Sequence, residues 1–164
     1  MRIAIVSDIH DRVDNLQKVF SFLEKEKIER IICCGDVGCK ETVQFFGEFK
    51  GTVDLVKGNM DEGYWYEEDI GAYSNIIFHG ARGEIEIKGV KIAFTHKPID
   101  AQPLAKSDKY DIVFYGHTHQ PWQKKIRNCL LINPGNCAGN PVPATFALCD
   151  APSMKLELKI IENL

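Results

Sequence analysis

Carboxylate, carboxamide and imidazole side chains follow several short apolar runs in this sequence. The first such group is Asp8-x-His10, one residue after the run Ile3 to Val6. Later runs end in the same way, in side chains that offer oxygen or nitrogen donors: Asp36, Asn59, His96, His117 and His119. This mixture of donors suits borderline divalent ions such as Mn²⁺, Fe²⁺, Ni²⁺ or Zn²⁺. The sequence therefore indicates a metal site rather than a nucleophilic side chain.

A carboxylate can bridge two cations, because each of its oxygens has lone pairs to give. Asp36 is the best candidate for this role, since it follows Gly35, which allows close approach of the backbone. Two ions held about 3.5 to 4 Å apart would lower the pKa of a shared water and yield a hydroxide for in-line attack on phosphorus. They would also neutralise charge that develops in the transition state.

Each motif taken alone has an ordinary structural interpretation. Gly35-Asp36 and Gly58-Asn59 resemble common turns, in which Asn tolerates a positive φ. A single His96 is more often a hydrogen-bonded core or loop histidine. The His-x-His pair after Gly116 is the stronger signal, because it follows an apolar run directly. The combination of all these segments favours a shared site.

The first third of the chain alternates between apolar runs and helical periodicity. Strands are predicted over residues 2–7, 30–34 and 51–56, and helices over 14–27 and 41–49. This order is typical of a parallel sheet with helices on its faces, and right-handed crossovers bring the strand ends to one edge. Asp8, His10, Asp36 and Asn59 would share that edge.

The rest of the chain is rich in short β runs separated by turns. They cover residues 76–78, 84–87, 90–95, 112–115, 122–126, 130–132, 145–148 and 154–160. We assign them to a second, mixed sheet, with the strands on both sides of the 133–143 loop in that same sheet. The two sheets, packed face to face and flanked by helices, would make an α/β, four-layer αββα sandwich. No linker or repeat divides the chain, so we expect a single domain over residues 1–164.

Composition limits the class of protein. The 164 residues are 45% hydrophobic and 26% charged, as in soluble globular domains. No apolar run approaches the roughly 18 residues that span a bilayer, and the N-terminus has no leader pattern, so we expect a cytoplasmic protein without a membrane partner. The net charge of −3 disfavours non-specific nucleic-acid binding. A small phosphate ester remains compatible, because bound ions supply positive charge locally.

The six cysteines give no metal motif. They stand at positions 33, 34, 39, 129, 137 and 149, without a CxxC pair, which argues against a structural zinc site. We interpret most of them as small buried hydrophobic residues kept reduced in the cytosol. Cys39 and Cys137 are expected on loops near the site.

The order and spacing of the donor residues resemble the calcineurin-like metallophosphoesterase superfamily over nearly the whole chain. The motifs that carry the resemblance are Asp8-x-His10, Gly35-Asp36, Gly58-Asn59-x-Asp61, His96 and Gly116-His117-x-His119. The small size and the run Ile132-Asn133-Pro134-Gly135 are similar to the compact prokaryotic phosphodiesterases of that superfamily. The resemblance implies an αββα sandwich with two divalent ions, Mn²⁺ or Ni²⁺ first and Fe²⁺ or Zn²⁺ as alternatives. It implies Asp8, His10 and His119 on the first ion, Asn59, His96 and His117 on the second, and Asp36 on both.

The sequence departs from the family at several positions. Met60 stands where many members carry a histidine thought to protonate the leaving group, and a thioether cannot donate a proton. Lys97 follows His96 where a Gly-His pair is common; it could contact a substrate phosphate or be a solvated loop residue. Arg12 could touch an anionic substrate or form a surface salt bridge.

The favoured function is therefore a metal-dependent phosphodiesterase acting on a small phosphodiester. The alternatives are a non-catalytic scaffold like the retromer subunit of similar fold, with Trp65 and Trp122 as contact residues, and a nuclease, which the acidic pI disfavours. A phosphomonoesterase is disfavoured by Met60. Exposed β edges and the aromatic residues Tyr64, Trp65 and Tyr66 predict a homodimer.

Overall fold

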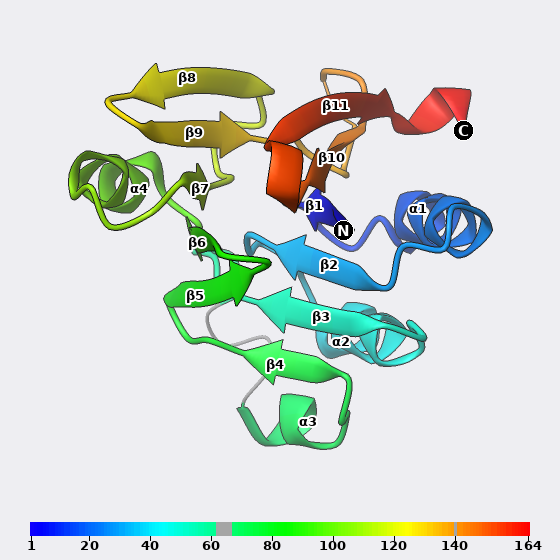
Figure 1. Cartoon of the computed structure of the whole chain (residues 1–164). Coiled ribbons are helices and arrows are strands. Elements are labelled where there is room, and N and C mark those ends of the chain that lie inside the picture. The colour runs from blue at the N-terminus through cyan, green and yellow to red at the C-terminus, as the bar shows by residue number, and fades with distance from the viewer. Residues whose placement is uncertain (62–66, 140) are drawn as a thin grey trace.

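The computed structural model describes residues 1–61, 67–139 and 141–164, and these form two mixed β-sheets packed face to face (Figure 1). The first sheet has the strand order β11-β10-β1-β2-β3-β4. Its strands are β1 (Arg2–Val6), β2 (Arg30–Cys33), β3 (Thr52–Leu55), β4 (Ile76–Phe78), β10 (Thr145–Asp150) and β11 (Lys155–Ile160). The strands β1 to β4 run parallel, and β10 pairs antiparallel with both β1 and β11.

The second sheet has the order β5-β6-β7-β9-β8. Its strands are β5 (Arg82–Ile87), β6 (Val90–Thr95), β7 (Ile112–Phe114), β8 (Trp122–Ile126) and β9 (Cys129–Asn133). The strands β6, β7 and β9 are parallel, while β5 and β8 are antiparallel edges. The second sheet is therefore mixed, as predicted, and the first sheet is mixed as well, because the antiparallel strand β10 joins it.

Helices cover the outer faces of the two sheets. They are α1 (Val13–Lys25), α2 (Lys40–Gly47), α3 (Glu67–Gly71) and α4 (Pro98–Lys106), with short 3-10 turns at Ala151–Ser153 and Ile161–Asn163. One apolar cluster joins the first sheet to α1, α2 and α3, a second fills the space between the sheets, and a third joins α4 to the second sheet. The predicted four-layer αββα sandwich is confirmed.

Strand β1 shows why the first apolar run has no polar alternation. Ile3 and Ile5 point into the cluster between the sheets, while Ala4 and Val6 point into the cluster under the helices. Both faces of the strand are covered, so both sets of side chains are apolar. Each run then ends where the chain leaves the core, and that is where the polar residues begin.

Two predictions about the later strands are wrong. The strands β4, β10 and β11 belong to the first sheet, so the strands on either side of the 133–143 loop lie in different sheets. The buried run Thr145–Cys149 can pair in either sheet; its register on β1, with Ile3 opposite Cys149, decides the matter. Helix α4 was not predicted, because Pro103 in its interior argues against a helix, although Pro98 stands at its first position, where proline is tolerated.

Candidate metal centre

The loops that follow β1, β2 and β3 meet the loops that follow β6 and β7. Backbone hydrogen bonds join the first two loops: the N–H of Asp8 donates to the carbonyl of Gly35 at 3.0 Å, and that of Ile9 donates to Asp36 at 2.8 Å. In the second sheet, the N–H of Gly116 donates to the carbonyl of His96 at 2.9 Å. The two sheets therefore present their polar strand ends to each other at one place.

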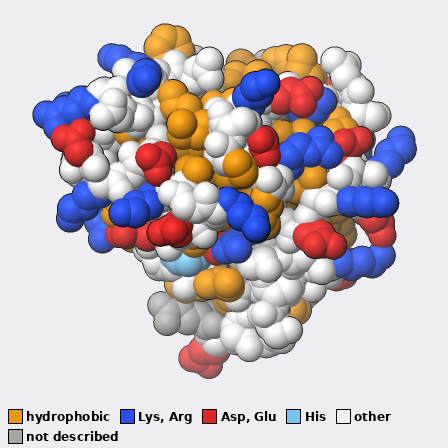
Figure 2. All heavy atoms as spheres, viewed as in Figure 1, with side chains coloured by type: hydrophobic (Ala, Val, Ile, Leu, Met, Phe, Trp, Pro, Cys, Tyr) orange, Lys and Arg blue, Asp and Glu red, His pale blue; other side chains and the backbone are white. Residues whose placement is uncertain are grey.

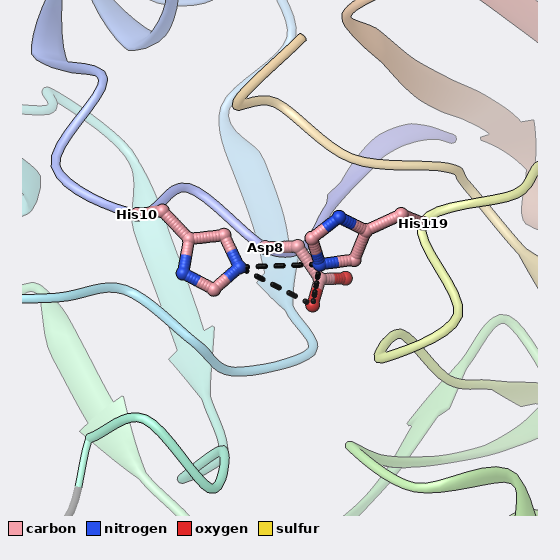
Figure 3. Close-up of side chains that lie close together, drawn as sticks. All are labelled: Asp8, His10 and His119. Atoms are coloured by element: carbon pink, nitrogen blue, oxygen red, sulfur yellow. Dashed lines mark hydrogen bonds and ion pairs between the residues drawn. The ribbon is translucent and has the colours of Figure 1, made fainter. Parts of the chain in front are cut away.

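Asp8, His10 and His119 form the first donor group (Figure 3). The Nε2 atoms of His10 and His119 lie 3.2 Å apart, and the Oδ1 atom of Asp8 lies 3.3 Å from Nε2 of His119. Asp8 is fully buried, whereas the two imidazoles are partly exposed. One oxygen and two nitrogens thus point at a common centre that is open to solvent on one side.

Asp36, His96 and His117 form the second donor group. Oδ2 of Asp36 lies 3.3 Å from Nε2 of His96, and Nδ1 of His117 lies 3.2 Å from that same nitrogen. The Oδ1 atom of Asn59 is 3.0 Å from Nε2 of His96, so the carboxamide belongs to this group as well.

The tautomer of His96 follows from its other nitrogen. Nδ1 lies 2.8 Å from the carbonyl oxygen of Cys34, which can only accept, so Nδ1 carries a proton and donates it. In the neutral ring, Nε2 then has a free lone pair directed at Asp36 and Asn59. An imidazole oriented in this way by a backbone carbonyl is the usual arrangement of a metal-ligating histidine.

Asp36 lies between the two groups. Its Oδ2 atom is 3.3 Å from Nε2 of His96 and 3.9 Å from Nε2 of His10. Its Oδ1 atom accepts a hydrogen bond from the backbone N–H of Met60 at 2.7 Å. The structure therefore brings together all seven residues that the sequence singled out as candidate ligands, with Asp36 in contact with both groups.

The donor set fits two divalent cations. Two buried carboxylates face four imidazoles, and in each group two ring nitrogens of neighbouring imidazoles lie 3.2 Å apart. Lone pairs at that separation repel unless a proton or a cation lies among them. Carboxylate, imidazole and carboxamide groups that converge in this way are the ligands of borderline divalent ions.

Burial and neighbouring charge act against each other on these groups. Burial raises the pKa of Asp8, although nearby imidazoles oppose the shift. Burial would also raise the pKa of Asp36, but the hydrogen bonds from His96 and the Met60 N–H outweigh it and lower the pKa. The pKa of His96 is raised by the two carboxylates in spite of its burial. The site is thus a buried negative centre that favours positive charge.

Most of the candidate ligands have a left-handed backbone. The φ values of Asp8, His10, Asp36, His117 and His119 lie between 45° and 70°. Residues other than glycine adopt this region at a cost of about 1 to 2 kcal/mol each. Such strain is found at functional sites, where the surrounding structure holds the residue in place.

Asp61 holds two of these loops, a role that the motif alone did not reveal. Its buried carboxylate accepts backbone hydrogen bonds of 2.8 to 3.1 Å from four residues: Asp36, Val37, Gly38 and Gly58. Asp61 therefore ties the loop that carries Asp36 to the loop that carries Asn59. The sequence signal was a carboxylate close after Gly58, where it can accept from nearby N–H groups.

Other supporting residues were also missed. Asp11 accepts hydrogen bonds from the N–H of Cys39 and the hydroxyl of Thr42. Asn133 donates to the carbonyl of Gly116, and Asn136 donates to that of His119. These side chains fix the loops of the candidate ligands through backbone atoms, which sequence patterns do not show.

Arg12 forms the surface salt bridge that was one of its two interpretations. Its guanidinium pairs with Asp14 at 3.1 Å and donates to the carbonyl of Ala138. Of the two cysteines expected on loops near the site, Cys39 precedes α2 and is partly exposed, and Cys137 is buried with its N–H donating to the carbonyl of Ser7.

Comparison with known proteins defines the class. Residues 1–154 match the family model of the calcineurin-like phosphoesterase superfamily domain, and the chain belongs to this superfamily. It is 32% identical over 144 residues to phosphodiesterase MJ0936 of Methanocaldococcus jannaschii, covering 85% of this chain and 86% of that protein.

Two solved structures have a similar fold. The structure of an archaeal phosphodiesterase superposes with a TM-score of 0.87 at 26% identity, covering 98% of this chain and 99% of the other. Vacuolar protein sorting 29 from Cryptosporidium parvum superposes with a TM-score of 0.71 at 20% identity, covering 97% and 95%, and shares the fold. No described helix has the length and apolar character needed to cross a membrane.

Proposed function

We propose that this protein is a cytoplasmic, metal-dependent phosphodiesterase formed by a single domain over residues 1–164. Its donor groups would hold two divalent ions, Mn²⁺ or Ni²⁺ first and Fe²⁺ or Zn²⁺ as alternatives. Asp8, His10 and His119 would hold one ion, Asn59, His96 and His117 the other, and Asp36 both. The observation that carries the proposal is the convergence of two donor groups, with Asp36 between them.

The bound ions would supply Lewis-acid activation of a water for in-line attack on phosphorus and would neutralise charge on the phosphoryl oxygens. The chain's own residues position that chemistry. The Cys34 carbonyl fixes the ring of His96, and Asp61 fixes the loop of Asp36. The exposed side of the first donor group leaves an approach for a substrate.

The leaving group receives no proton from residue 60. The Met60 side chain is 46% exposed, while its backbone N–H is engaged with Asp36. A general acid usually contributes about 10²- to 10⁴-fold, so its absence favours esters whose leaving group departs readily. This supports a small phosphodiester as substrate over a phosphomonoester.

The two alternative functions have less support. A non-catalytic scaffold does not require a donor set of this completeness, in strained backbone, around buried carboxylates. A nuclease needs a basic surface to bind the phosphate backbone, and the chain carries a net charge of −3.

The proposal is tested by metal analysis together with hydrolysis of bis-p-nitrophenyl phosphate, with Mn²⁺, Ni²⁺, Fe²⁺ and Zn²⁺ added in turn. Asp36→Asn should abolish both metal retention and turnover. Asp108→Asn is a matched control, because Asp108 is exposed and also has a left-handed backbone, with φ of 57° against 52° for Asp36. A protein without ions and without turnover under every metal would favour the scaffold.

We also propose a homodimer, as the sequence predicted, although residues 64–66 lie outside the described part of the chain. The edge strands β8 and β11 flank an apolar groove that includes Trp122 and Leu158, which are 61% and 48% exposed. Figure 2 shows hydrophobic side chains gathered on the upper part of this face. Light scattering on the wild type and on a Trp122→Ser, Leu158→Ser variant tests it: a monomeric wild type would contradict the proposal.

A further inference from the structure

A cavity of about 250 Å³ opens beside the second donor group. It is lined by residues of both sheets and of α4: Lys57, Gly58, Asn59, Phe78, Gly80, Ala81, Thr95, His96, Lys97 and Asp100. Because Asn59 and His96 are also candidate ligands, the cavity is continuous with the metal centre. We call it the lysine cavity.

The two lysines of this cavity lie on opposite sheets. Lys57 follows β3 and is half-buried, and Lys97 precedes α4 and is exposed. Within the described ranges, neither ammonium group has a hydrogen bond or ion pair. By contrast, the nearby Arg82 is paired with Glu84, and Arg12 is paired with Asp14. In a chain of net negative charge, two unpaired cations on one small cavity form a local positive site.

The size of the cavity limits what it can take. Pockets for drug-sized ligands usually measure about 300 to 1,000 Å³, so this one suits a phosphate on a short linker better than a whole nucleoside. A lysine ammonium binds phosphate as a point charge without a fixed geometry, and two of them can approach one phosphate from different sides. The metal centre would already hold the phosphodiester group itself.

We propose that the lysine cavity binds a second phosphate group carried on one ester arm of the substrate. This inference rests on the proposed function and names the substrate class: phosphodiesters with an additional terminal phosphate. The group that is hydrolysed lies at the metal centre, and the terminal phosphate lies between Lys57 and Lys97.

Asp100 sets the charge of the cavity. Its carboxylate is exposed, lines the same space in the first turn of α4 and opposes a bound anion. Replacing it with asparagine keeps the shape of the side chain and removes one negative charge. Asp100→Asn should therefore strengthen binding of the second phosphate, whereas loss of the lysines should weaken it.

The probes are α,ω-alkanediol bisphosphates of two, three and four carbons, each compared with the alkyl monophosphate of the same length. Their affinity for the metal-loaded protein is measured by titration calorimetry, and their inhibition constants against bis-p-nitrophenyl phosphate are measured in parallel. We expect at least one bisphosphate to bind about tenfold or more tightly than its monophosphate, as one charged hydrogen bond provides.

The variants separate the cavity from the metal centre. Lys57→Ala with Lys97→Ala should remove the bisphosphate preference, and Asp100→Asn should increase it. Lys91→Ala, an exposed lysine at the opposite end of β6 from His96, should leave it as in the wild type. The readout is the ratio of the affinities for bisphosphate and monophosphate within one variant. A variant that binds both compounds more weakly leaves this ratio unchanged.

The inference is overturned if the wild type does not prefer the bisphosphate, or if the double lysine variant keeps that preference. The proposed function still stands in that case, provided that the protein hydrolyses bis-p-nitrophenyl phosphate. Absence of hydrolysis with every ion overturns the proposed function. In that case the calorimetric ratio still decides whether the lysine cavity binds a second phosphate.

Discussion

Replacing Asp61 with asparagine tests how the loops of the metal centre are held. The two carboxylate oxygens divide the four backbone donors evenly: Oδ1 accepts from Val37 and Gly38, and Oδ2 accepts from Asp36 and Gly58. An asparagine amide has one oxygen only. Whichever way the amide turns, its NH₂ group faces two N–H donors, which are left without an acceptor in the interior.

The magnitude follows from this count. A buried donor without a partner costs about 1 to 3 kcal/mol, so two of them cost about 2 to 6 kcal/mol of unfolding free energy. That is a large share of the roughly 5 to 15 kcal/mol by which domains are stable. Burial raises the pKa of Asp61 and the backbone donors oppose the shift.

The measurement is urea unfolding of the chelator-treated protein at pH 7.5, followed by circular dichroism. Removal of the ions matters, because bound ions would add their own stabilisation of the native state. Asp108→Asn serves as the control, since that carboxylate is exposed, and it should change the stability by less than about 0.5 kcal/mol. A loss below about 1 kcal/mol for Asp61→Asn would show that the carboxylate does not hold these donors.

The same variant distinguishes a residue that holds the loops from a residue that binds the metal. Asp61 is absent from both donor groups, yet it ties the loop of Asp36 to the loop of Asn59. Asp61→Asn should therefore weaken metal retention without removing a ligand, and excess metal should restore turnover in part. Asp36→Asn should not be restored in this way, and equal recovery of both variants would remove the distinction.

Three further outcomes are expected. His119→Ala, measured by elemental analysis, should lower the metal content from two ions toward one, because it removes a donor from the first group alone; an unchanged content would exclude His119 as a ligand. Met60→His should raise turnover of diesters with poor leaving groups by about 10²-fold and flatten the dependence of rate on leaving-group pKa, whereas an unaltered slope would contradict the role given to this position. Burial raises the pKa of Cys137 and of Cys149 to about 12. A disulfide reagent at pH 8 should therefore titrate only the partly exposed Cys39 in the native protein, and all six thiols after denaturation. Rapid reaction of more than one thiol in the native protein would show that the core opens.

The parts of the fold that could be predicted are those in which local pattern and packing agree. The run Ile3 to Val6 is apolar because both faces of β1 are covered, and the same holds for Ile31 to Cys34 at β2, so the ends of these runs and the polar residues beyond them were visible. The sheet to which β10 belongs could not be predicted, because it depends on pairing with β1, which lies almost the whole chain away in sequence. A buried run carries no sign of which sheet it joins.

The candidate site divides in the same way. Donor side chains can be recognised by type and position, whereas supports such as Asp11 and Asp61 act on backbone N–H groups that have no signature of their own. His79 is a further case. No sequence pattern pairs it with Asp54, yet its Nε2 atom lies 2.9 Å from the buried carboxylate of that residue, which also pairs with Arg30.

The backbone strain at the centre explains why the donors follow strands rather than helices. A strand that ends in the core must turn at once for its next side chains to face the strand ends of the other sheet, and a left-handed residue makes that turn in one step. Asp8 does so with φ of 54°, and its carboxylate then accepts the N–H of His117, itself left-handed, at 3.0 Å. The hydrogen bond links the two sheets through the site. At Asp8 the cost of the turn is therefore offset by a contact that also fixes His117.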